Sequence, residues 1–420
     1  MAADDQRRRA PLLAVEFATA AAGTANGVVS VALPWLVLER TGSAAAAGLL
    51  AALTAIPLLA SSFVAGTIVD RFGRRRVSIA SDLASAVSVA LLPIVDAAWG
   101  LSFGMIAVLA VLGVMLDPVG ITARETMLPE AADAARMGRE RANGIHEAVW
   151  GAAFVVGPGM AGVLISIVGP VNTLLATTAA FVISAAVITL IPVPVPVIPD
   201  DSRAGQTGFV GETLQGLRFV WNDRVLRSMA IVMMVLAGLY FPIEAVLLPV
   251  YFLAQDAPER LGLLVVAMSG GGIIGALAYG AIGPRFSRRA AFVGSIVCTC
   301  VALTPMAFLP PFGIMLGFGV IVGVVAGAIG PLLNLVMQER SPNHLRGRVV
   351  GVITSLDYSI GPVGFLGAGA AVDAFGVKAT FIAIAGGFLL VSAYAIASPA
   401  LHELDAPGSP RQGSCDTADG

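Results

Sequence analysis

The chain has 420 residues, of which 57% are hydrophobic and only 12% are charged, and its mean hydropathy is +0.87. Because soluble domains keep about a quarter of their residues charged, this composition excludes a soluble globular protein and indicates a partner in the lipid bilayer. The net charge is −2, and the basic residues are explained by membrane topology, so no nucleic-acid partner is expected.

Apolar stretches long enough to cross a bilayer recur along the whole chain. A helix needs about 20 apolar residues to span a hydrocarbon core of roughly 30 Å. The stretches predict an all-α membrane protein with twelve transmembrane helices, at about residues 12–38, 44–69, 77–98, 101–122, 143–168, 171–192, 228–253, 261–284, 290–309, 312–337, 349–372 and 377–398.

Polar segments divide these helices into two groups of six. Pro192, Pro194 and Pro196 end the sixth stretch, and residues 211–227 predict a short amphipathic helix on the membrane surface. The expected parts are a cytoplasmic tail at 1–11, a six-helix bundle at 12–192, a cytoplasmic linker at 193–227, a second six-helix bundle at 228–398 and a disordered cytoplasmic tail at 399–420.

The basic residues indicate the orientation. With the amino terminus inside, all 25 Lys and Arg except Arg40, Arg260 and Lys378 fall on the cytoplasmic side. Positive residues concentrate in cytoplasmic loops, so both termini are predicted to be cytoplasmic. Lysine is nearly absent beside abundant arginine and alanine, which is typical of a GC-rich bacterial genome, so we expect a bacterial inner-membrane protein.

An internal repeat runs through the chain. The segment from Gly66 to Arg76 returns further along as Gly280 to Arg289, and both copies follow a Gly-Leu-Leu sequence at residues 48–50 and 262–264. A second match, with a nearly equal offset, pairs Arg141, Gly144, Gly162 and Gly169 with Arg348, Gly351, Gly369 and Gly376. Such repeats are common in transporters and predict two pseudo-symmetric six-helix bundles.

Several classes of chemistry have no signal. Cys298, Cys300 and Cys415 suggest neither a disulfide framework nor a metal site, and the three histidines are scattered. No nucleotide-binding loop, zinc-protease motif, nucleophile elbow or dinucleotide fingerprint is present. We therefore expect no cofactor, no direct use of ATP and no enzymatic activity.

These motifs resemble the major facilitator superfamily. Its signature between helices 2 and 3 is a glycine, an acidic residue and Arg-x-Gly-Arg-Arg, and residues 66–76 match each key position. The exporter pattern of helix 5 is matched by Gly151, Gly157, Pro158 and Gly162, with Ala161 where many members have glycine. Residues 33–35, 117–118, 128–130 and 141–143 are similar to the branch that holds macrolide and siderophore exporters.

The resemblance implies a gating latch in the loop between helices 2 and 3. Its expected members are Gly66, Asp70, Arg71, Gly73, Arg74 and Glu130. Asp70 would meet the positive amino terminus of helix 11 in the state closed to the cytoplasm, a contact worth roughly 0.3–2 kcal/mol. The arginine partner is expected to be Glu130, with Asp117 as second choice; alternatively, the arginines only anchor the topology. Gly66 is expected at a close helix contact and Gly73 in a tight turn.

The second copy has Pro284 where Asp70 stands, so the latch is asymmetric. In the exporter motif, the glycines would let helices approach and Pro158 would bend its helix, which ordinary helix packing also explains.

Carboxylates inside the spans are candidates for proton coupling, because ionisable groups in hydrocarbon are costly. Glu244 lies in helix 7 with no basic residue within ten positions, and Asp117 in helix 4 is the second candidate. Burial disfavours the charged form of a carboxyl group, which suits a reversible proton carrier. The alternative is a neutral acid bonded to a neighbouring helix or one that faces water. Glu16, His146, Glu147 and Asp357 are expected to reach the interface or to pair with loop arginines, and Asp96 and Asp373 to be solvated.

The resemblance also implies that helices 1, 4, 7 and 10 line a central cavity, which makes Asn26, Tyr240 and Asn334 candidate substrate contacts. Each asparagine could equally make a hydrogen bond between helices. Few polar groups lie on these helices, so an amphiphilic organic substrate is favoured over a sugar. The function expected is proton-driven export of a hydrophobic or amphiphilic small molecule by a monomer with alternating access. The alternatives are a proton-coupled nutrient importer and a non-transporting membrane sensor or assembly partner.

Overall fold

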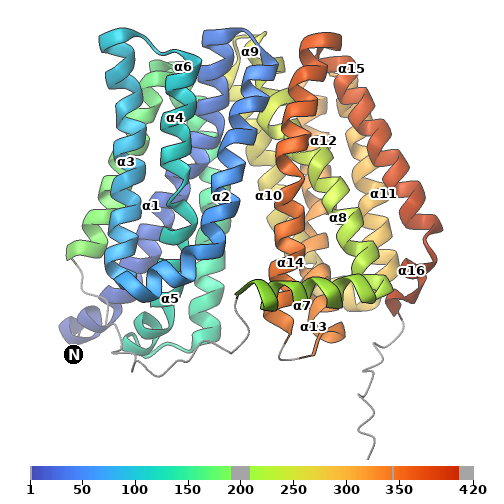
Figure 1. Ribbon diagram of the computed structural model, residues 1–420, viewed down its shortest axis with the longest axis horizontal. Coiled ribbons are helices and arrows are strands. Elements are labelled where there is room, and N and C mark those ends of the chain that lie inside the picture. The colour runs from blue at the N-terminus through green and yellow to red at the C-terminus, as the bar shows by residue number, and fades with distance from the viewer. Residues whose placement is uncertain (1, 191–208, 343–344, 406–420) are drawn as a thin grey trace, which may run out of the picture.

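The computed structural model describes residues 2–190, 209–342 and 345–405. Within these ranges every regular element is a helix, and Figure 1 shows two bundles that lie side by side. The first bundle contains α1 (Ala2–Thr41), α2 (Ala44–Phe72), α3 (Arg74–Trp99), α4 (Phe103–Val114), α5 (Asp117–Ala134) and α6 (Arg139–Leu190).

The second bundle follows a short helix, α7 (Phe209–Asn222). It contains α8 (Arg224–Pro242), the π-helical turn η1 (Ile243–Leu247), α9 (Leu248–Leu253), α10 (Pro258–Ile282), the 3₁₀ turn η2 (Gly283–Arg285), α11 (Arg288–Ala307), α12 (Phe312–Gly327), α13 (Ile329–Arg340), α14 (Arg346–Ser359) and α15 (Gly361–Ala397). The short α16 (Pro399–His402) and η3 (Glu403–Asp405) close the described part of the chain.

Ten helical stretches of the described residues are long and apolar enough to cross a membrane. Two of them, Arg141–Leu190 and Arg348–Ala397, have 50 residues each, or about 75 Å of helix at 1.5 Å per residue. Each bends at a glycine with positive φ, Gly169 (79°) and Gly376 (82°), and therefore crosses twice. The predicted all-α fold of twelve spans in two bundles is confirmed.

The duplicated glycines explain both bends. A positive φ of this kind is strained for a residue with a Cβ and open to glycine, so the chain can reverse there. Gly169 and Gly376 are a pair in the second match of the internal repeat. The repeat seen in the sequence is thus a repeat of backbone geometry.

The predicted boundary of the fourth span was wrong. It was expected at 101–122, but α4 and α5 continue to Ala134 with a break at Met115 and Leu116. The charges of residues 124–134 indicated a loop, yet Arg124 is buried inside α5. Its charge is compensated by a partner on α3, described below.

The expected linker falls partly outside the described residues, since residues 191–208 are not among them. Of the tail expected to be disordered at 399–420, residues 399–405 form α16 and η3 with Leu401 and Leu404 buried, and residues 406–420 lie outside the described residues. The amphipathic helix predicted at 211–227 corresponds to α7, which ends at Asn222, and to the start of α8. Val220 of α7 is fully buried. Figure 1 shows α7 lying across the axes of the long helices at one end of the second bundle.

The two halves meet through glycines far from the arginine clusters. We call the end with Arg71–Arg76 and Arg285–Arg289 the arginine-rich end, and the end with both glycine bends the opposite end. A Cβ on Gly48 of α2 would lie 2.3 Å from the Phe365 carbonyl oxygen of α15, and one on Gly162 of α6 would lie 2.6 Å from the Pro258 carbonyl oxygen of α10. Only glycine permits such backbone contact between halves.

Nearer the arginine-rich end, the glycines of these spans have no close neighbours from the other half. A Cβ added to Gly66, Gly144, Gly280 or Gly351 would meet no atom within 4 Å. The close contact expected at Gly66 is therefore absent in this conformation. The backbones of the two halves are therefore in contact at the opposite end and separated around the four glycines nearer the arginine-rich end.

Candidate functional site

Helices of the second bundle line an open cavity of about 370 Å³. Its lining is mostly apolar and aromatic, with Phe241, Phe388 and Met268 among the contributors. Two carboxylates also line it, Glu244 of η1 and Asp357 of α14, and none of the lining residues is basic. An apolar cavity with a few convergent polar groups is the usual form of a small-molecule site.

Glu244 owes its position to a local change of helix type. Pro242 ends α8 and is followed by the π-helical turn Ile243–Leu247, which carries Glu244. A π turn inserts an extra residue into the helix and is frequent at functional sites. The Glu244 Oε1 accepts a hydrogen bond from the Tyr240 hydroxyl at 2.9 Å, one helical turn earlier.

Asp357 was expected to reach the interface or to pair with a loop arginine, and it pairs with no arginine in the described part of the chain. It lines the cavity with Glu244, and its Oδ1 is buried without a hydrogen-bond partner among the described residues. The aspartate had no distinctive pattern in the sequence. Only the packing of α14 against α8 brings it to the cavity.

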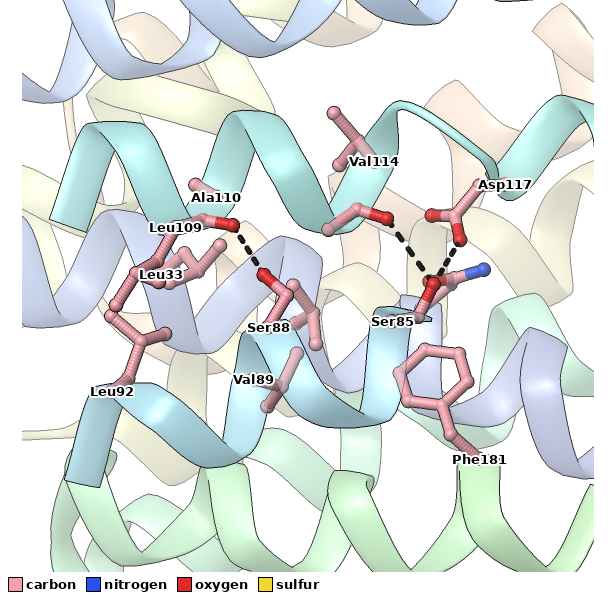
Figure 2. A pocket seen from close by; sticks show the side chains of 13 residues that line it. Leu33, Ser85, Ser88, Val89, Leu92, Leu109, Ala110, Val114, Asp117 and Phe181 are labelled. Atoms are coloured by element: carbon pink, nitrogen blue, oxygen red, sulfur yellow. Dashed lines mark hydrogen bonds between the residues drawn. The ribbon is translucent and has the colours of Figure 1, made fainter. Parts of the chain in front are cut away.

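Asp117 occupies a separate, much smaller site in the first bundle (Figure 2). It begins α5 after the break in the fourth span, and its Oδ1 accepts a hydrogen bond of 2.8 Å from Ser85 on α3. The cavity there has about 20 Å³, room for one water molecule, and Asn26 lines it too. Figure 2 also shows Ser88 bonded to the Leu109 carbonyl oxygen of α4. Two serines of α3 thus donate hydrogen bonds to the span formed by α4 and α5.

The three candidate substrate contacts do not share one cavity. Asn26 lines the small cavity beside Asp117, whereas Tyr240 lines the larger one. Asn334 lines neither of these two cavities and is exposed. Tyr240 lines a cavity built only by residues of the second half, not one shared by both halves. Neither the rotation of α13 nor the separation of the two cavities was visible in the sequence.

Arg74 lies where the latch hypothesis expected an arginine. Its Nη1 donates to Glu130 Oε1 at 2.8 Å and to the Thr126 carbonyl oxygen at 2.7 Å. Arg75 donates to the Ile188 and Thr189 carbonyl oxygens, which end α6. A cation is favoured at a helix carboxyl terminus, so Arg75 has a structural role.

The second half repeats this arrangement. Arg288 pairs with Glu339 of α13, and Arg289 donates to the Ile396 carbonyl oxygen at the end of α15. Both pairs lie within one half, as does Arg74 with Glu130. These arginines therefore connect helices within each bundle and make no contact between the halves among the described residues.

Asp70 is exposed and makes no hydrogen bond or ion pair with any described residue in this conformation. Arg71 beside it is also exposed and lies over the ring of Phe72, 5.7 Å from its centroid. Gly73 has φ of 88° and separates α2 from α3, as expected of a tight turn. Its backbone N–H bonds the Val69 carbonyl oxygen and ends α2.

A buried ion pair that the sequence did not indicate joins α3 to α5. Arg124 of α5 donates to Asp82 of α3 at 2.9 Å, and the side chains are only 4% and 3% exposed. Ser184 of α6 donates to the second oxygen of Asp82 at 2.6 Å. The ion pair joins α3 to α5, and Ser184 adds α6. It lies near Asp117, because Asp82 stands on α3 between Ser81 and Ser85, whose hydroxyls bond Leu116 and Asp117.

Glu16 and His146 form a second buried pair, although these two residues were expected at the interface or beside loop arginines. The Glu16 Oε1 of α1 lies 3.2 Å from the His146 Nδ1 of α6. Their remaining polar atoms, Oε2 and Nε2, have no partner among the described residues. Of the two possibilities expected for these residues, a pair with a loop arginine is not found among the described residues.

The exporter motif divides its contacts between two helices. A Cβ on Gly157 would lie 2.7 Å from both the Gly27 Cα and the Thr24 carbonyl oxygen of α1. Gly151 and Gly162 instead face α10 in the other half, at Ile273 and Gly262. The Pro158 carbonyl oxygen faces Gly262 as well, so the motif joins both the first bundle and the two halves.

The chain and its fold resemble those of known membrane transporters. The chain is 45% identical over 406 residues to "Multidrug efflux pump Tap" of Mycolicibacterium fortuitum, covering 96% of this chain and 99% of that protein. It is 24% identical over 388 residues to "Macrolide efflux protein A" of Streptococcus pyogenes, covering 90% and 93%. The fold matches the crystal structure of the nucleoside transporter NupG with a TM-score of 0.75, at 14% identity, over 92% of this chain and 98% of that one. The pattern of the Major Facilitator Superfamily matches residues 15–365 and 245–414, and the chain belongs to this family of membrane transporters.

Proposed function

We propose that the protein is a proton-driven exporter of amphiphilic organic molecules, and that cationic ones are preferred. The observation that carries the proposal is the cavity of the second bundle, which combines apolar and aromatic walls with Glu244 and Asp357 and has no basic lining residue. A carboxylate in such surroundings is stabilised either by a proton or by an organic cation. A carboxylate that binds either a proton or the cationic substrate can exchange the one for the other across the membrane.

The relatives support export over import. Proteins called multidrug and macrolide efflux proteins align with almost the whole chain, and the names describe those proteins. By the distribution of basic residues, the arginine-rich end and both termini face the cytoplasm of a bacterial inner membrane. The conformation parted at that end would then receive its substrate from the cytoplasm or the inner leaflet.

The proposed roles of the residues follow from their places. Glu244, held by Tyr240, takes up and releases the proton, and Asp357 shares the cavity with it. Asp117 serves as a second proton site in the first bundle, near the Asp82–Arg124 pair. Asp70 is free to cap α14 once the halves close at the arginine-rich end, which is the latch expected of residues 66–76.

Transport in proteoliposomes tests the function. Purified protein is reconstituted, a pH gradient is imposed, and flux of lipophilic cations, macrolides and siderophores is followed in protein and empty vesicles. We expect gradient-driven flux of cationic amphiphiles and proton movement in the opposite direction. Flux of none of these compounds by folded, monodisperse protein would contradict the proposal. Co-directional movement of proton and substrate would instead indicate the importer.

A further inference from the structure

A carboxylate of the second half caps a helix of the first half at the opposite end. Asp373 of α15 accepts a hydrogen bond from the Ser43 hydroxyl (2.7 Å) and two more from the backbone N–H groups of Ala44 (2.8 Å) and Ala45 (3.0 Å). Ser43 is the N-cap of α2. The first N–H groups of a helix lack partners within it and attract an anion, so this contact joins the halves.

Backbone packing beneath Asp373 fixes its position. One helical turn before it, a Cβ on Gly369 would lie 2.7 Å from the Ala44 carbonyl oxygen. One turn earlier still, the Phe365 carbonyl oxygen faces Gly48. Residues 365, 369 and 373 share one face of α15 because they are four apart, and this face lies along the beginning of α2.

The same spacing recurs at the arginine-rich end of the same two spans. Asp373 follows the contact glycine Gly369 by four residues, and Asp70 follows Gly66 by four residues. On α2, Gly66 lies about five helical turns beyond Gly48, and Gly351 precedes Gly369 by the same interval along α14 and α15. Because this interval is close to a whole number of turns, the two glycines of each span lie on one face.

We propose that Asp373 is a positioning residue of the transport cycle, the counterpart of Asp70 at the other end of the α2–α15 contact. Asp373 caps α2 while the halves are closed at the opposite end, and its release accompanies opening there. The part that concerns Asp70 rests on the proposed function. The contacts of Asp373 stand independently of the substrate, the coupling ion and the direction of transport.

The other contact between the halves, α6 with α10, lacks a carboxylate at the corresponding positions. The positions four residues after Gly162 and Gly280 are Ser166 and Pro284, and neither can supply a carboxylate. Ser166 donates to the Val163 carbonyl oxygen within its own helix. Among the described residues, the repeated glycine-to-carboxylate spacing therefore belongs to the contact between α2 and α15.

Distance measurements between spin labels test the proposal. Labels are attached to Asn172→Cys and Ala379→Cys, two exposed positions that follow the two glycine bends, in a background lacking Cys298, Cys300 and Cys415. Asp373→Ala is compared with Asp96→Ala as a matched control. Asp96 also lies at the opposite end and pairs with Arg40 at 2.6 Å, but within one half.

We expect Asp373→Ala to raise the ratio of long to short distances about three- to tenfold, because one cap of the closed end is lost. Asp373→Asn keeps the shape and one acceptor oxygen and should have a smaller effect. Asp96→Ala should leave the ratio unchanged. An unchanged distribution in Asp373→Ala, or an equal shift in Asp96→Ala, would overturn the proposal.

The Asp70→Ala variant separates this inference from the latch. It should lower the proportion of long distances, since Asp70 would stabilise the other conformation. If Asp373→Ala shifts the distances and Asp70→Ala does not, the cap at Asp373 stands and the alternation between the two carboxylates is refuted.

Discussion

Asp82 and Arg124 carry opposite charges into the interior of the first bundle, where neither can be solvated. Asp82→Asn would leave the Arg124 guanidinium without its anion, and the loss of one partner of a buried pair costs about 3–5 kcal/mol. We expect a marked fall in the midpoint of thermal unfolding in detergent, followed by size-exclusion fluorescence. The double variant Asp82→Asn/Arg124→Gln should recover part of the loss.

The matched control is Asp133→Asn, which breaks the Asp133–Arg139 pair. That pair has the same N···O distance of 2.9 Å, but its Arg139 and Asp133 side chains are 65% and 56% exposed. Exposed ion pairs contribute little, so the midpoint should not change. A fall as large as that of Asp82→Asn would show that burial is not the cause.

Glu244 gives a second prediction at the scale of one residue. Glu244→Gln keeps the volume and an acceptor for the Tyr240 hydroxyl but cannot exchange a proton. We expect loss of gradient-driven flux, by at least tenfold, with substrate counterflow retained, both measured in proteoliposomes. Tyr240→Phe, which removes only the hydrogen bond, should reduce flux less. Unchanged gradient-driven flux in Glu244→Gln would remove this residue from the coupling mechanism.

Among the elements, α6 offers a direct comparison of two glycines. A Cβ at Gly157 would collide with α1 at 2.7 Å, whereas a Cβ at Gly144 would meet no atom within 4 Å. Alanine favours a helix over glycine by about 0.8–1 kcal/mol. Gly144→Ala should therefore keep or raise the thermal midpoint, and Gly157→Ala should lower it. Equal midpoints would show that α1 can move away without cost.

The sequence predicted the existence of the membrane-spanning helices better than it predicted where each helix ends and which residues it contacts. Apolar length and the repeated glycines were sufficient for twelve spans, because lipid demands both long helices and internal backbone bonding. The fourth span was predicted to end too early because a charged residue such as Arg124 usually indicates a loop, and its partner Asp82 is far away in the sequence. Arg74 with Glu130 followed from family resemblance. Asp357 and Asp373 depend on how helices rotate and which half they face, and no periodicity in a single chain encodes that.

At the scale of the molecule, two parallel sets of glycine contacts relate the halves. α2 packs on α15, and α6 packs on α10, each through glycines at the opposite end. Both pairs are antiparallel, so a step of about five helical turns along each span leads from one contact to a second pair of glycines. These second pairs are Gly66 with Gly351 and Gly144 with Gly280, about 27 Å nearer the arginine-rich end.

Rocking of the halves should bring these second pairs together. In a chain without its native cysteines, Gly66→Cys and Gly351→Cys should form a disulfide under mild oxidation, because the closed state would bring their Cα atoms within the roughly 4.4–6.8 Å that a disulfide needs. Asp373→Ala, which frees the opposite end, should accelerate the reaction. The diagonal pair Gly66→Cys and Gly280→Cys, on helices that face different partners, serves as the control. Crosslinking of both pairs at the same rate, read as a mobility shift on gels, would mean random collision in a loosened bundle; no crosslinking of Gly66→Cys with Gly351→Cys would mean that the halves close through other faces.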